Sequence, residues 1–174
     1  AARKPLTTIS FGDAGECRYH AFVNEELLIC QVSDTIDLWN ARTGTRQTTA
    51  RVPVPGDNLA TLKWAISRSV DRMVIGQRNG ARIRIHELPS GKLIRYLPGD
   101  RDAEMARMEF SPDGRSLLLA CEDSVIRLWD VATRQVKMEF DWAIGQVCSI
   151  AFAPDGLTAA AAGDSEVVIW DLDG

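Results

Sequence analysis

The stretch MARMEFSPDGRSLLLACEDSVIRLWDVATRQVKMEF, from Met105 to Phe140, decides the fold. It divides into four short apolar or β-branched runs that polar turn residues separate. Within SPDG at 111–114, proline presets φ at one turn position and glycine accepts a positive φ at another, so a hairpin between the first two runs is encoded locally. Because the runs are short and no long helical period interrupts them, the stretch predicts four antiparallel strands joined by tight turns.

The same unit recurs along the chain, and two landmarks mark the repeat. The first landmark is the third run, which reads IDLWNARTG at 36–44, IRIHELPSG at 83–91, IRLWDVATR at 126–134 and VVIWDLDG at 167–174. Its aromatic position falls at Trp39, His86, Trp129 and Trp170, so it returns about every 45 residues, within the range of repeat architectures. The second landmark, the turn proline, falls at Pro112 and Pro154, with nearly the same spacing as Trp129 and Trp170. Two landmarks with one step establish an internal repeat.

The step and the strand pattern together predict the fold class. A period of roughly 40–45 residues is the size of a four-stranded propeller blade. Second strands such as LLLAC at 117–121 and TAAAA at 158–162 are apolar on both faces, so they need cover on both sides, which stacked blades supply. A β-sandwich would not explain the step. We therefore predict an all-β fold, a β-propeller of four-stranded antiparallel blades, with four blades present in an incomplete ring.

The predicted blades form a single region over 1–174. They occupy approximately 17–51, 60–97, 105–140 and 147–174, and residues 4–10 are predicted to form a lone outer strand.

Composition excludes several classes of function. The 174 residues carry a formal net charge of −4, whereas a nucleic-acid partner requires a basic face, so none is expected. The chain contains no apolar run of the roughly 20 residues that cross a bilayer, and AARKPLTTIS at its start is no signal peptide as it stands, so no membrane partner is expected. The four cysteines form no CxxC pair, which predicts buried reduced thiols, no metal site and a cytoplasmic location.

Motifs of catalysis are missing from the sequence. It contains no GxGxxG, GxxxxGK[ST], HExxH or GxSxG pattern. The two histidines, His20 and His86, lie inside strand-like segments at unrelated positions of the repeat, which disfavours a Ser-His-Asp arrangement. We therefore expect no enzyme activity, no catalytic residue and no cofactor in this chain.

The motif IRLWD at 126–130, with SPDG upstream, resembles the WD-repeat family, and the resemblance covers nearly the whole chain. Trp129-Asp130 and Trp170-Asp171 match the family motif in full, whereas Trp39-Asn40 and His86-Glu87 are weakened versions. The resemblance implies that the aromatic residues pack between blades and that His86 is a packing residue. The alanine- and arginine-rich composition resembles that of bacterial members of this family. The structural blade residues that it implies are Trp39, Trp129, Trp170, Asp130 and Asp171.

One departure from the family concerns a buried polar network. Members often carry a Gly-His pair before a blade's first strand, and its histidine joins a network with the aspartate of a later turn. The corresponding stretches here read VPGDN, LPGDR and FDWAIG, without histidine. Asp34, Asp123 and Asp164 are therefore interpreted as turn formers, and blade stability is expected to depend more on packing.

The two ends of the chain leave three alternatives open. In the family, an N-terminal outer strand commonly completes the last blade, and here the last copy stops just after its third strand. The chain is then the C-terminal part of a larger propeller with missing upstream blades, which we favour. Alternatively, two chains associate head to tail in an eight-bladed ring, or one chain closes a four-bladed ring. Propellers of these sizes exist.

The resemblance implies a protein–protein interaction scaffold that binds other proteins or peptides. In the family, one face is built by the loops that enter each first strand and by the turns between second and third strands. Aromatic and arginine side chains dominate binding hot spots, which singles out Trp142. Alternatively, Trp142 caps the core at a blade junction. The candidate partner-binding residues are Trp142, Arg101, Arg78, Asp102 and Asn58.

Two other functions remain as alternatives. The first is a regulatory or ligand-sensing propeller domain of a larger multidomain enzyme such as a kinase, and the second is a central channel that binds a small molecule. For the leading hypothesis, we expect Trp142→Ala with Arg101→Ala to weaken partner binding without unfolding the domain.

Overall fold

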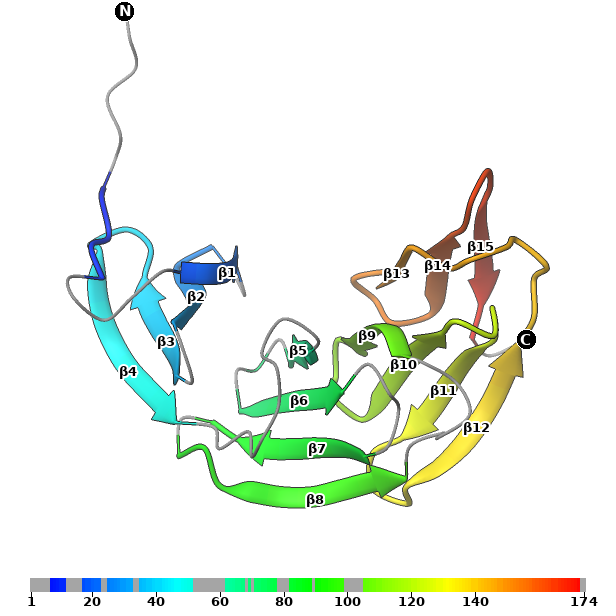
Figure 1. The fold of residues 1–174 in the computed structure, drawn as a ribbon, viewed down its shortest axis with the longest axis horizontal. Helices are drawn as coiled ribbons and strands as arrows, with labels where there is room; N and C mark the ends of the chain where they lie inside the picture. Colours follow the sequence, from blue (N-terminus) through cyan, green and yellow to red (C-terminus); the bar gives the residue numbers. More distant parts are fainter. Residues whose placement is uncertain are drawn as a thin grey trace, which may run out of the picture. The chain divides into compact units, whose positions relative to one another are not determined.

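The computed structural model describes residues 7–11, 17–22, 25–32, 35–51, 62–67, 69, 71–77, 82–88, 90–98 and 105–172. Within these ranges the chain forms strands and turns and no helix (Figure 1). Two compact units are present, one made of residues 1–59 with 88–92 and the other of residues 60–87 with 93–174. The predicted all-β class is confirmed.

The strands form four antiparallel sheets, and in each sheet every strand pairs with its neighbour in sequence. The first sheet contains β1 (Cys17–Phe22), β2 (Leu27–Val32), β3 (Thr35–Asn40) and β4 (Thr45–Arg51). The second contains β5 (Leu62–Ile66), β6 (Arg72–Gln77), β7 (Arg82–Glu87) and β8 (Leu93–Pro98). The third contains β9 (Met105–Phe110), β10 (Ser116–Cys121), β11 (Ile126–Asp130) and β12 (Gln135–Phe140). The fourth contains β13 (Ser149–Phe152), β14 (Thr158–Ala162) and β15 (Val167–Asp171).

The fourth sheet has three strands in the described part of the chain, in the order β13-β14-β15. Its third strand β15 therefore has no described neighbour on its outer side. Residues 7–10 form no strand in the structure, whereas the sequence predicts an outer strand over 4–10, of which 4–6 lie outside the described residues. A strand requires a paired neighbour to satisfy its backbone groups, and this segment has none among the described strands. Instead, Ile9 and Phe11 pack against Trp39 in the first unit.

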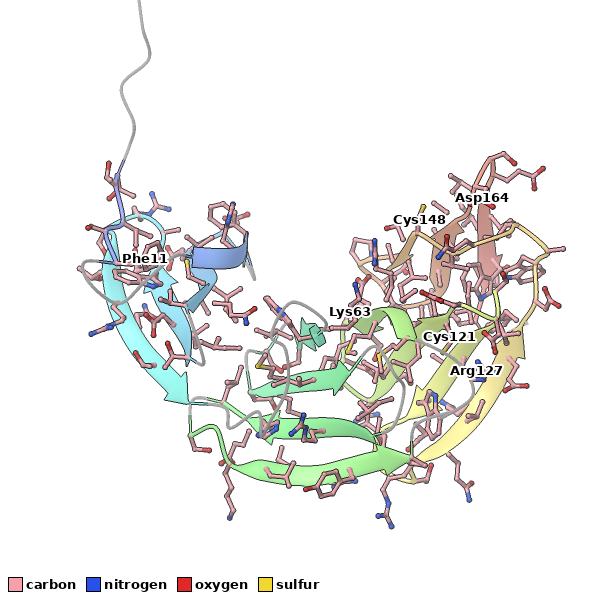
Figure 2. All side chains as sticks on the ribbon, in the orientation of Figure 1. Phe11, Lys63, Cys121, Arg127, Cys148 and Asp164 are labelled. Atoms are coloured by element: carbon pink, nitrogen blue, oxygen red, sulfur yellow. The ribbon has the colours of Figure 1, made fainter. Side chains whose placement is uncertain are left out.

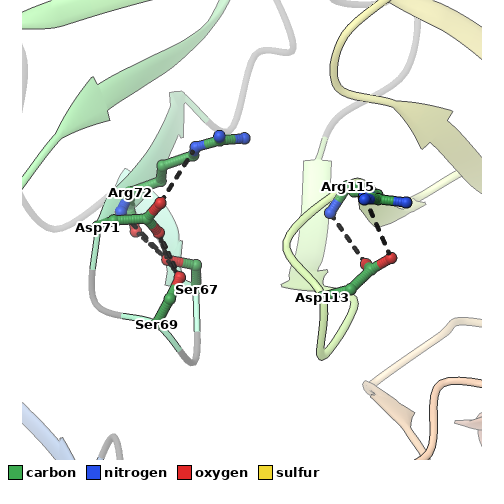
Figure 3. A network of polar contacts seen from close by, with 6 residues as sticks. All are labelled: Ser67, Ser69, Asp71, Arg72, Asp113 and Arg115. Atoms are coloured by element: carbon green, nitrogen blue, oxygen red, sulfur yellow. Dashed lines mark hydrogen bonds and ion pairs between the residues drawn. The ribbon is translucent and has the colours of Figure 1, made fainter.

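Short polar turns connect the first and second strands, as the SPDG signal predicts. Ser111 Oγ donates a hydrogen bond to Asp113 Oδ1 at 2.6 Å, and Asp113 in turn accepts the Arg115 backbone N–H at 3.0 Å. Gly114 adopts a φ of +68°, a conformation that L side chains rarely adopt. The second sheet builds its turn from Ser67, Ser69 and Asp71 instead (Figure 3). Two different residue sets therefore produce one hairpin connection.

Apolar faces of neighbouring sheets enclose the core of the second unit. One cluster joins the second and third sheets, and its members include Ile83 and Ile85 on one side and Leu117 and Trp129 on the other. A second cluster joins the third and fourth sheets in the same way. Its buried members are Leu118, Ala120, Ile126, Leu128, Ile144, Val147, Ile150, Ala159, Ala161, Trp170 and Leu172. Both faces of the third sheet are therefore buried, as its doubly apolar second strand predicts.

Gly76 on β6 lies in close contact with the third sheet. A Cβ atom at this glycine would overlap the side chains of Met105 and Met108 on β9. Gly76 on β6 and Ala120 on β10 are equivalent positions of two repeats. Because both residues are small, the first strand of the next sheet can pack against each of them.

Candidate interaction surface

The repeated tryptophans occupy the interior of the sheets rather than a binding surface. Trp39, Trp129 and Trp170 are each exposed by 8% or less, and His86 at the same repeat position is also buried. The indole N–H groups of these three tryptophans have no hydrogen-bond partner among the described residues. Packing therefore dominates around them, as the absence of the Gly-His pair predicts.

The residues after Trp129 and Trp39, Asp130 and Asn40, each close the next turn. Asp130 Oδ1 accepts the Thr133 backbone N–H at 2.7 Å, and this bond is the main cause of the lowered pKa of Asp130. Asn40 accepts the corresponding N–H group of Thr43 at 2.8 Å, so the amide replaces the carboxylate without loss of the turn. Asp171 is exposed on β15 and ends the last described strand.

The turn between β10 and β11 holds a charged triad. Arg127 Nη2 donates to Asp123 Oδ2 at 2.7 Å, and Arg127 Nε donates to Glu139 Oε1 at 3.0 Å. Burial disfavours the charged guanidinium, but the hydrogen bond and charge of Asp123 outweigh it, so the pKa of Arg127 is raised. Asp123 also accepts the Val125 N–H at 3.0 Å, which fits its interpretation as a turn former. Asp34 lies outside the described residues.

The loop 141–146 and the turn 163–165 bind to each other closely. Asp164 donates its backbone N–H to the Ile144 carbonyl at 3.1 Å and accepts the Gln146 N–H on Oδ2 at 3.3 Å. A Cβ atom at Gly163 would overlap the Ile144 carbonyl oxygen, and one at Gly145, whose φ is +76°, would overlap the Asp164 carboxylate. Two glycines therefore permit this loop and this turn to form one rigid rim.

Trp142 in this loop contacts the aromatic core. Its ring lies parallel to Phe140 with centroids 5.9 Å apart and at 47° to Trp170 with centroids 5.7 Å apart. The side chain is 39% exposed, so one part of the indole faces solvent and the other covers the core. This geometry supports the alternative of a capping residue and still leaves surface for a ligand.

Four other predicted contact residues cannot be placed relative to Trp142. Arg101, Arg78, Asp102 and Asn58 all lie outside the described residues. The described parts of this predicted face are the loop 141–146, which enters the fourth sheet, and the turns 122–124 and 163–165 between second and third strands. The described part of the predicted surface therefore belongs to the third and fourth sheets.

A cavity of about 270 Å³ lies beside this rim, in the second unit. Strand β5 contributes Lys63 to it and β9 contributes Arg107, while Gln146 and Cys148 come from the segment that enters β13. Figure 2 labels Lys63 and Cys148. Arg107 is exposed and Lys63 is half-buried. The remaining lining residues are Met105, Ala106, Glu122 and Val147. Two cations, one carboxylate, one amide and one thiol thus surround one concave site.

Lys63 and Arg107 occupy equivalent positions of two successive first strands. Each lies three residues before the strand's last residue, and each pairs with a small residue on the second strand, Gly76 and Ala120 respectively. Lys63 and Arg107 are not among the contact residues that were predicted from the sequence. Comparison of β5 and β9 in register would have found this pair, because a basic residue occurs at the same position of both strands.

Other kinds of site are not found where the structure is described. No group of three or more His, Cys, Asp or Glu side chains is placed to hold a metal ion among those residues. The described residues also contain no helix that is long and apolar enough to cross a membrane.

Four-stranded antiparallel meanders that repeat at this step and pack face to face are blades of the β-propeller class of repeat proteins. Family comparison agrees with this assignment and makes it specific. Residues 91–130 and 140–171 match the family described as WD domain, G-beta repeat. The chain therefore carries repeats of the WD40 family.

Three relatives show how far the similarity extends. The mouse (Mus musculus) WD repeat and SOCS box-containing protein 1 is 31% identical over 133 residues, which is 70% of this chain and 30% of that protein. Pre-mRNA-processing factor 19 homolog 2 of Arabidopsis thaliana is 31% identical over 88 residues, 50% of this chain and 17% of that protein. The guanine nucleotide-binding protein subunit beta of Oryza sativa subsp. indica is 24% identical over 180 residues, 96% of this chain and 47% of that protein. The chain spans about half or less of the length of these relatives.

Proposed function

We propose that this chain is a protein–protein interaction scaffold formed by WD repeats, and that it binds an acidic segment of another protein or peptide. One observation carries the proposal: equivalent positions of two successive first strands present Lys63 and Arg107 to one cavity of about 270 Å³. Two cations and the single carboxylate of Glu122 give the site a net positive charge, which favours an anionic side chain, because complementary charges fix the register and speed association.

The neighbouring rim supports a peptide rather than a small ligand. The loop 141–146 and the turn 163–165 are joined through Asp164, so they offer a rigid border to the cavity. Trp142 on the same loop exposes part of its indole. The loop that carries Trp142 also contributes Gln146 to the charged cavity, so it can offer an apolar anchor in addition to the ionic contact that the cavity provides. The proposal assigns binding, and no reaction, to this chain.

The names of the relatives support an assembly role. One relative is a subunit of a guanine nucleotide-binding protein, and another carries WD repeats together with a SOCS box. Their repeats are thus parts of larger proteins or complexes. We extend this to the present chain as part of the proposal, including further blades outside it.

The proposal also covers the cellular location of the protein and the kind of organism from which it comes. Cys30 and Cys121 are buried thiols, which supports a reducing compartment such as the cytoplasm. A bacterial source stays a prediction, and the three relatives described above come from plants and an animal.

The test uses a random peptide display library that is selected on the purified chain. We expect the selected peptides to be enriched in Asp and Glu, and fluorescence anisotropy then gives the Kd of the most frequent sequence. The double variant Lys63→Gln with Arg107→Gln should weaken binding about tenfold or more, because each neutral side chain removes one ionic contact.

A matched control is Arg115→Gln, which removes a charge from a strongly exposed arginine in the β9–β10 turn. This variant should leave the Kd unchanged. Selected peptides without acidic enrichment, or equal Kd values for the double variant and the native chain, would contradict the proposal.

A further inference from the structure

A second cavity, of about 330 Å³, lies at the junction of the third and fourth sheets. Residues of the β9–β10 turn and of the β13–β14 turn border it, so it lies at the opposite end of β9 from the cavity of Lys63 and Arg107. The two cavities share no described residue. Leu128 and Leu172 form a buried apolar part of its wall.

The preceding junction, between the second and third sheets, shows which side chain occupies the equivalent place. Arg95 on β8 crosses that junction, and its Nη1 donates to the Val131 and Ala132 carbonyls, both at 3.0 Å. These carbonyls belong to the turn that follows β11, and Arg95 lies beside Ile85 in the pairing of β7 with β8. An arginine of one sheet therefore binds the turn of the next sheet.

At the junction of the third and fourth sheets a methionine replaces that arginine. Met138 pairs with Leu128 on the third sheet as Arg95 pairs with Ile85 on the second. Since a thioether has no hydrogen to donate, Met138 cannot make the contact that Arg95 makes with the following turn.

The acceptor side of this contact is retained. The Leu172 N–H donates to the Leu157 carbonyl at 2.9 Å, just as the Val131 N–H donates to the Arg115 carbonyl at 2.9 Å. The backbone at Leu172 therefore follows the course of Val131, whose own carbonyl binds Arg95. Because Leu172 lines the cavity, the place that a guanidinium takes at one junction is a cavity at the next.

The cavity also has the charge that a guanidinium requires. Asp113 and Asp155 line it from the two turns, and Lys137 on β12 is the one cation among its described lining residues, so the net charge is negative. Each carboxylate accepts a backbone N–H of its own turn on Oδ1, at 3.0 Å, so Oδ2 can accept a further donor. Asp113 Oδ2 lies 4.0 Å from Nε of the strongly exposed Arg115, a contact that solvent screens (Figure 3).

We infer that this cavity binds an arginine side chain from a basic segment of another protein. The guanidinium donates to the Leu172 carbonyl and to the carboxylates of Asp113 and Asp155. Arginine suits this site better than lysine, because its planar fork of N–H donors reaches several acceptors at once and its weakly hydrated faces pack on carbon side chains. Phe152 and Leu128 supply such side chains in the cavity wall.

The site does not depend on where the chain ends. The third sheet has its own outer strand β12, and the turn carbonyls that follow β11 still accept Arg95 from the neighbouring sheet. An outer strand on the fourth sheet would pair with β15 as β12 pairs with β11, and would leave the turn accessible in the same way. The inference is also independent of the acidic peptide at Lys63 and Arg107, so either one can fail alone.

The probe is a blocked pentapeptide with one central arginine, acetyl-Gly-Ser-Arg-Ser-Gly-amide, compared with its lysine counterpart. A titration of the ¹⁵N-labelled chain by NMR follows the backbone amides of residues 155–157. We expect saturable shifts at these amides, with a Kd for the arginine peptide at least about fivefold lower than for the lysine peptide. The Lys63→Gln with Arg107→Gln chain should give the same Kd, which separates this site from the proposed one.

Met138→Arg tests the inference from within the chain, because it supplies the arginine that Arg95 supplies at the preceding junction. The new side chain should occupy the cavity and weaken binding of the arginine peptide about tenfold or more, since an intramolecular group competes at high effective concentration. Met138→Leu is the matched control and should bind like the native chain.

Asp113→Asn with Asp155→Asn should weaken binding about fivefold or more, because both charge-assisted contacts are lost. An amide keeps the acceptor of the turn, as Asn40 does in the first sheet. Asp155→Asn alone replaces the double variant if the NMR spectrum shows that the latter has lost its fold. Glu166→Gln removes an exposed carboxylate from the turn at the other end of β14 and should leave the Kd unchanged.

Three results would overturn the inference. If the arginine peptide causes no saturable shift at residues 155–157, the cavity does not accept the side chain. If the arginine and lysine peptides have equal Kd values, the cavity only attracts cations in general. If the Met138→Arg chain binds the peptide as tightly as the native chain, the peptide binds elsewhere.

Discussion

The Phe11 ring meets the Trp39 indole edge-on, with centroids 5.7 Å apart and an interplanar angle of 84°. Trp142 and Trp170 of the fourth sheet have the same centroid distance of 5.7 Å, with an interplanar angle of 47°. The spacing along the sequence is also the same, because Phe11 precedes Trp39 by as many positions as Trp142 precedes Trp170. An aromatic residue in the segment that leads into a blade thus covers the blade's own tryptophan in both cases.

Trp142→Ala should therefore lower the free energy of unfolding by about 1–3 kcal/mol, because the half-exposed indole loses its contacts with Phe140 and Trp170. Urea denaturation monitored by circular dichroism measures this change. Trp142→Phe retains a ring and should lose less than half as much. A stability equal to that of the native chain would restrict Trp142 to a role in binding, and Trp142→Ala with Arg101→Ala would then weaken binding alone.

The sequence predicted the blade pattern well because its signals are local. The SPDG turn, the apolar runs and the repeated aromatic residue each determine a strand or its end within a few neighbours, and β9 to β12 follow one another along the chain. The role of Trp142 was left between two alternatives, since its contact with Trp170 joins a loop residue to a strand much later in the sequence. The alternation of apolar and polar residues along a single strand carries no information about such a contact.

Acid should destabilise the fold through the carboxylates of the turns. The pKa of Asp113 is lowered chiefly by the hydrogen bond from Ser111, and that of Asp71 chiefly by the one from Ser69. Because the folded pKa values lie below the unfolded ones, the unfolded chain binds protons first as the pH falls. The stabilisation is complete above about pH 5 and is lost as the pH falls through the unfolded value near 4 and on through the folded values.

Urea midpoints at several pH values between neutrality and pH ~3 measure this loss. The native midpoint should fall with pH, and Asp113→Asn should show a smaller fall. Glu166→Gln removes a charge from an exposed side chain in the β14–β15 turn and serves as the control. If the midpoint rises as the pH falls, the assigned direction of the pKa shifts is wrong.

Gly163→Ala should disrupt the rigid rim. The added methyl group would overlap the Ile144 carbonyl oxygen, and the backbone can relieve the overlap only by moving the loop 141–146 away from the turn. We expect a loss of about 1–3 kcal/mol in the free energy of unfolding, together with weaker binding of the selected acidic peptide.

Ser165→Ala changes an exposed residue of the same turn and should alter the free energy of unfolding by less than about 0.5 kcal/mol. If the Gly163→Ala and Ser165→Ala variants have equal free energies of unfolding, the contact between the loop 141–146 and the turn 163–165 does not stabilise the fold.

Cys148 should react with thiol reagents in the native chain, whereas Cys30 and Cys121 should react only after unfolding. Cys148 is exposed at the cavity and donates its S–H to the Ala162 carbonyl at 3.3 Å, while the other two thiols are buried. Mass spectrometry after a short iodoacetamide pulse locates the modified residue, in a Cys17→Ser background that removes the fourth thiol. Labelling of Cys121 at the rate of Cys148 would contradict the packing of β10 between two sheets.

The basic pair at the cavity escaped prediction for a different reason. Lys63 and Arg107 are separated by a whole repeat, and each is an ordinary charged residue within its own strand. Their common site arises only because consecutive sheets place the same strand position next to each other. Arg78 and Arg101 were selected because they lie in predicted loops, and both are outside the described residues. Their contribution to partner binding therefore stays a prediction.

Every described strand in the four sheets pairs with its neighbour in sequence, so each described hydrogen-bonded ladder joins nearby parts of the chain (Figure 1). Because loop closure over short distances is fast, each meander can form as soon as its own residues leave the ribosome. Cooperativity must then come from the apolar junctions between sheets, as in a one-dimensional array of coupled units. The order of synthesis therefore gives the order of folding, and each new sheet is stabilised when it finds the sheet made just before it.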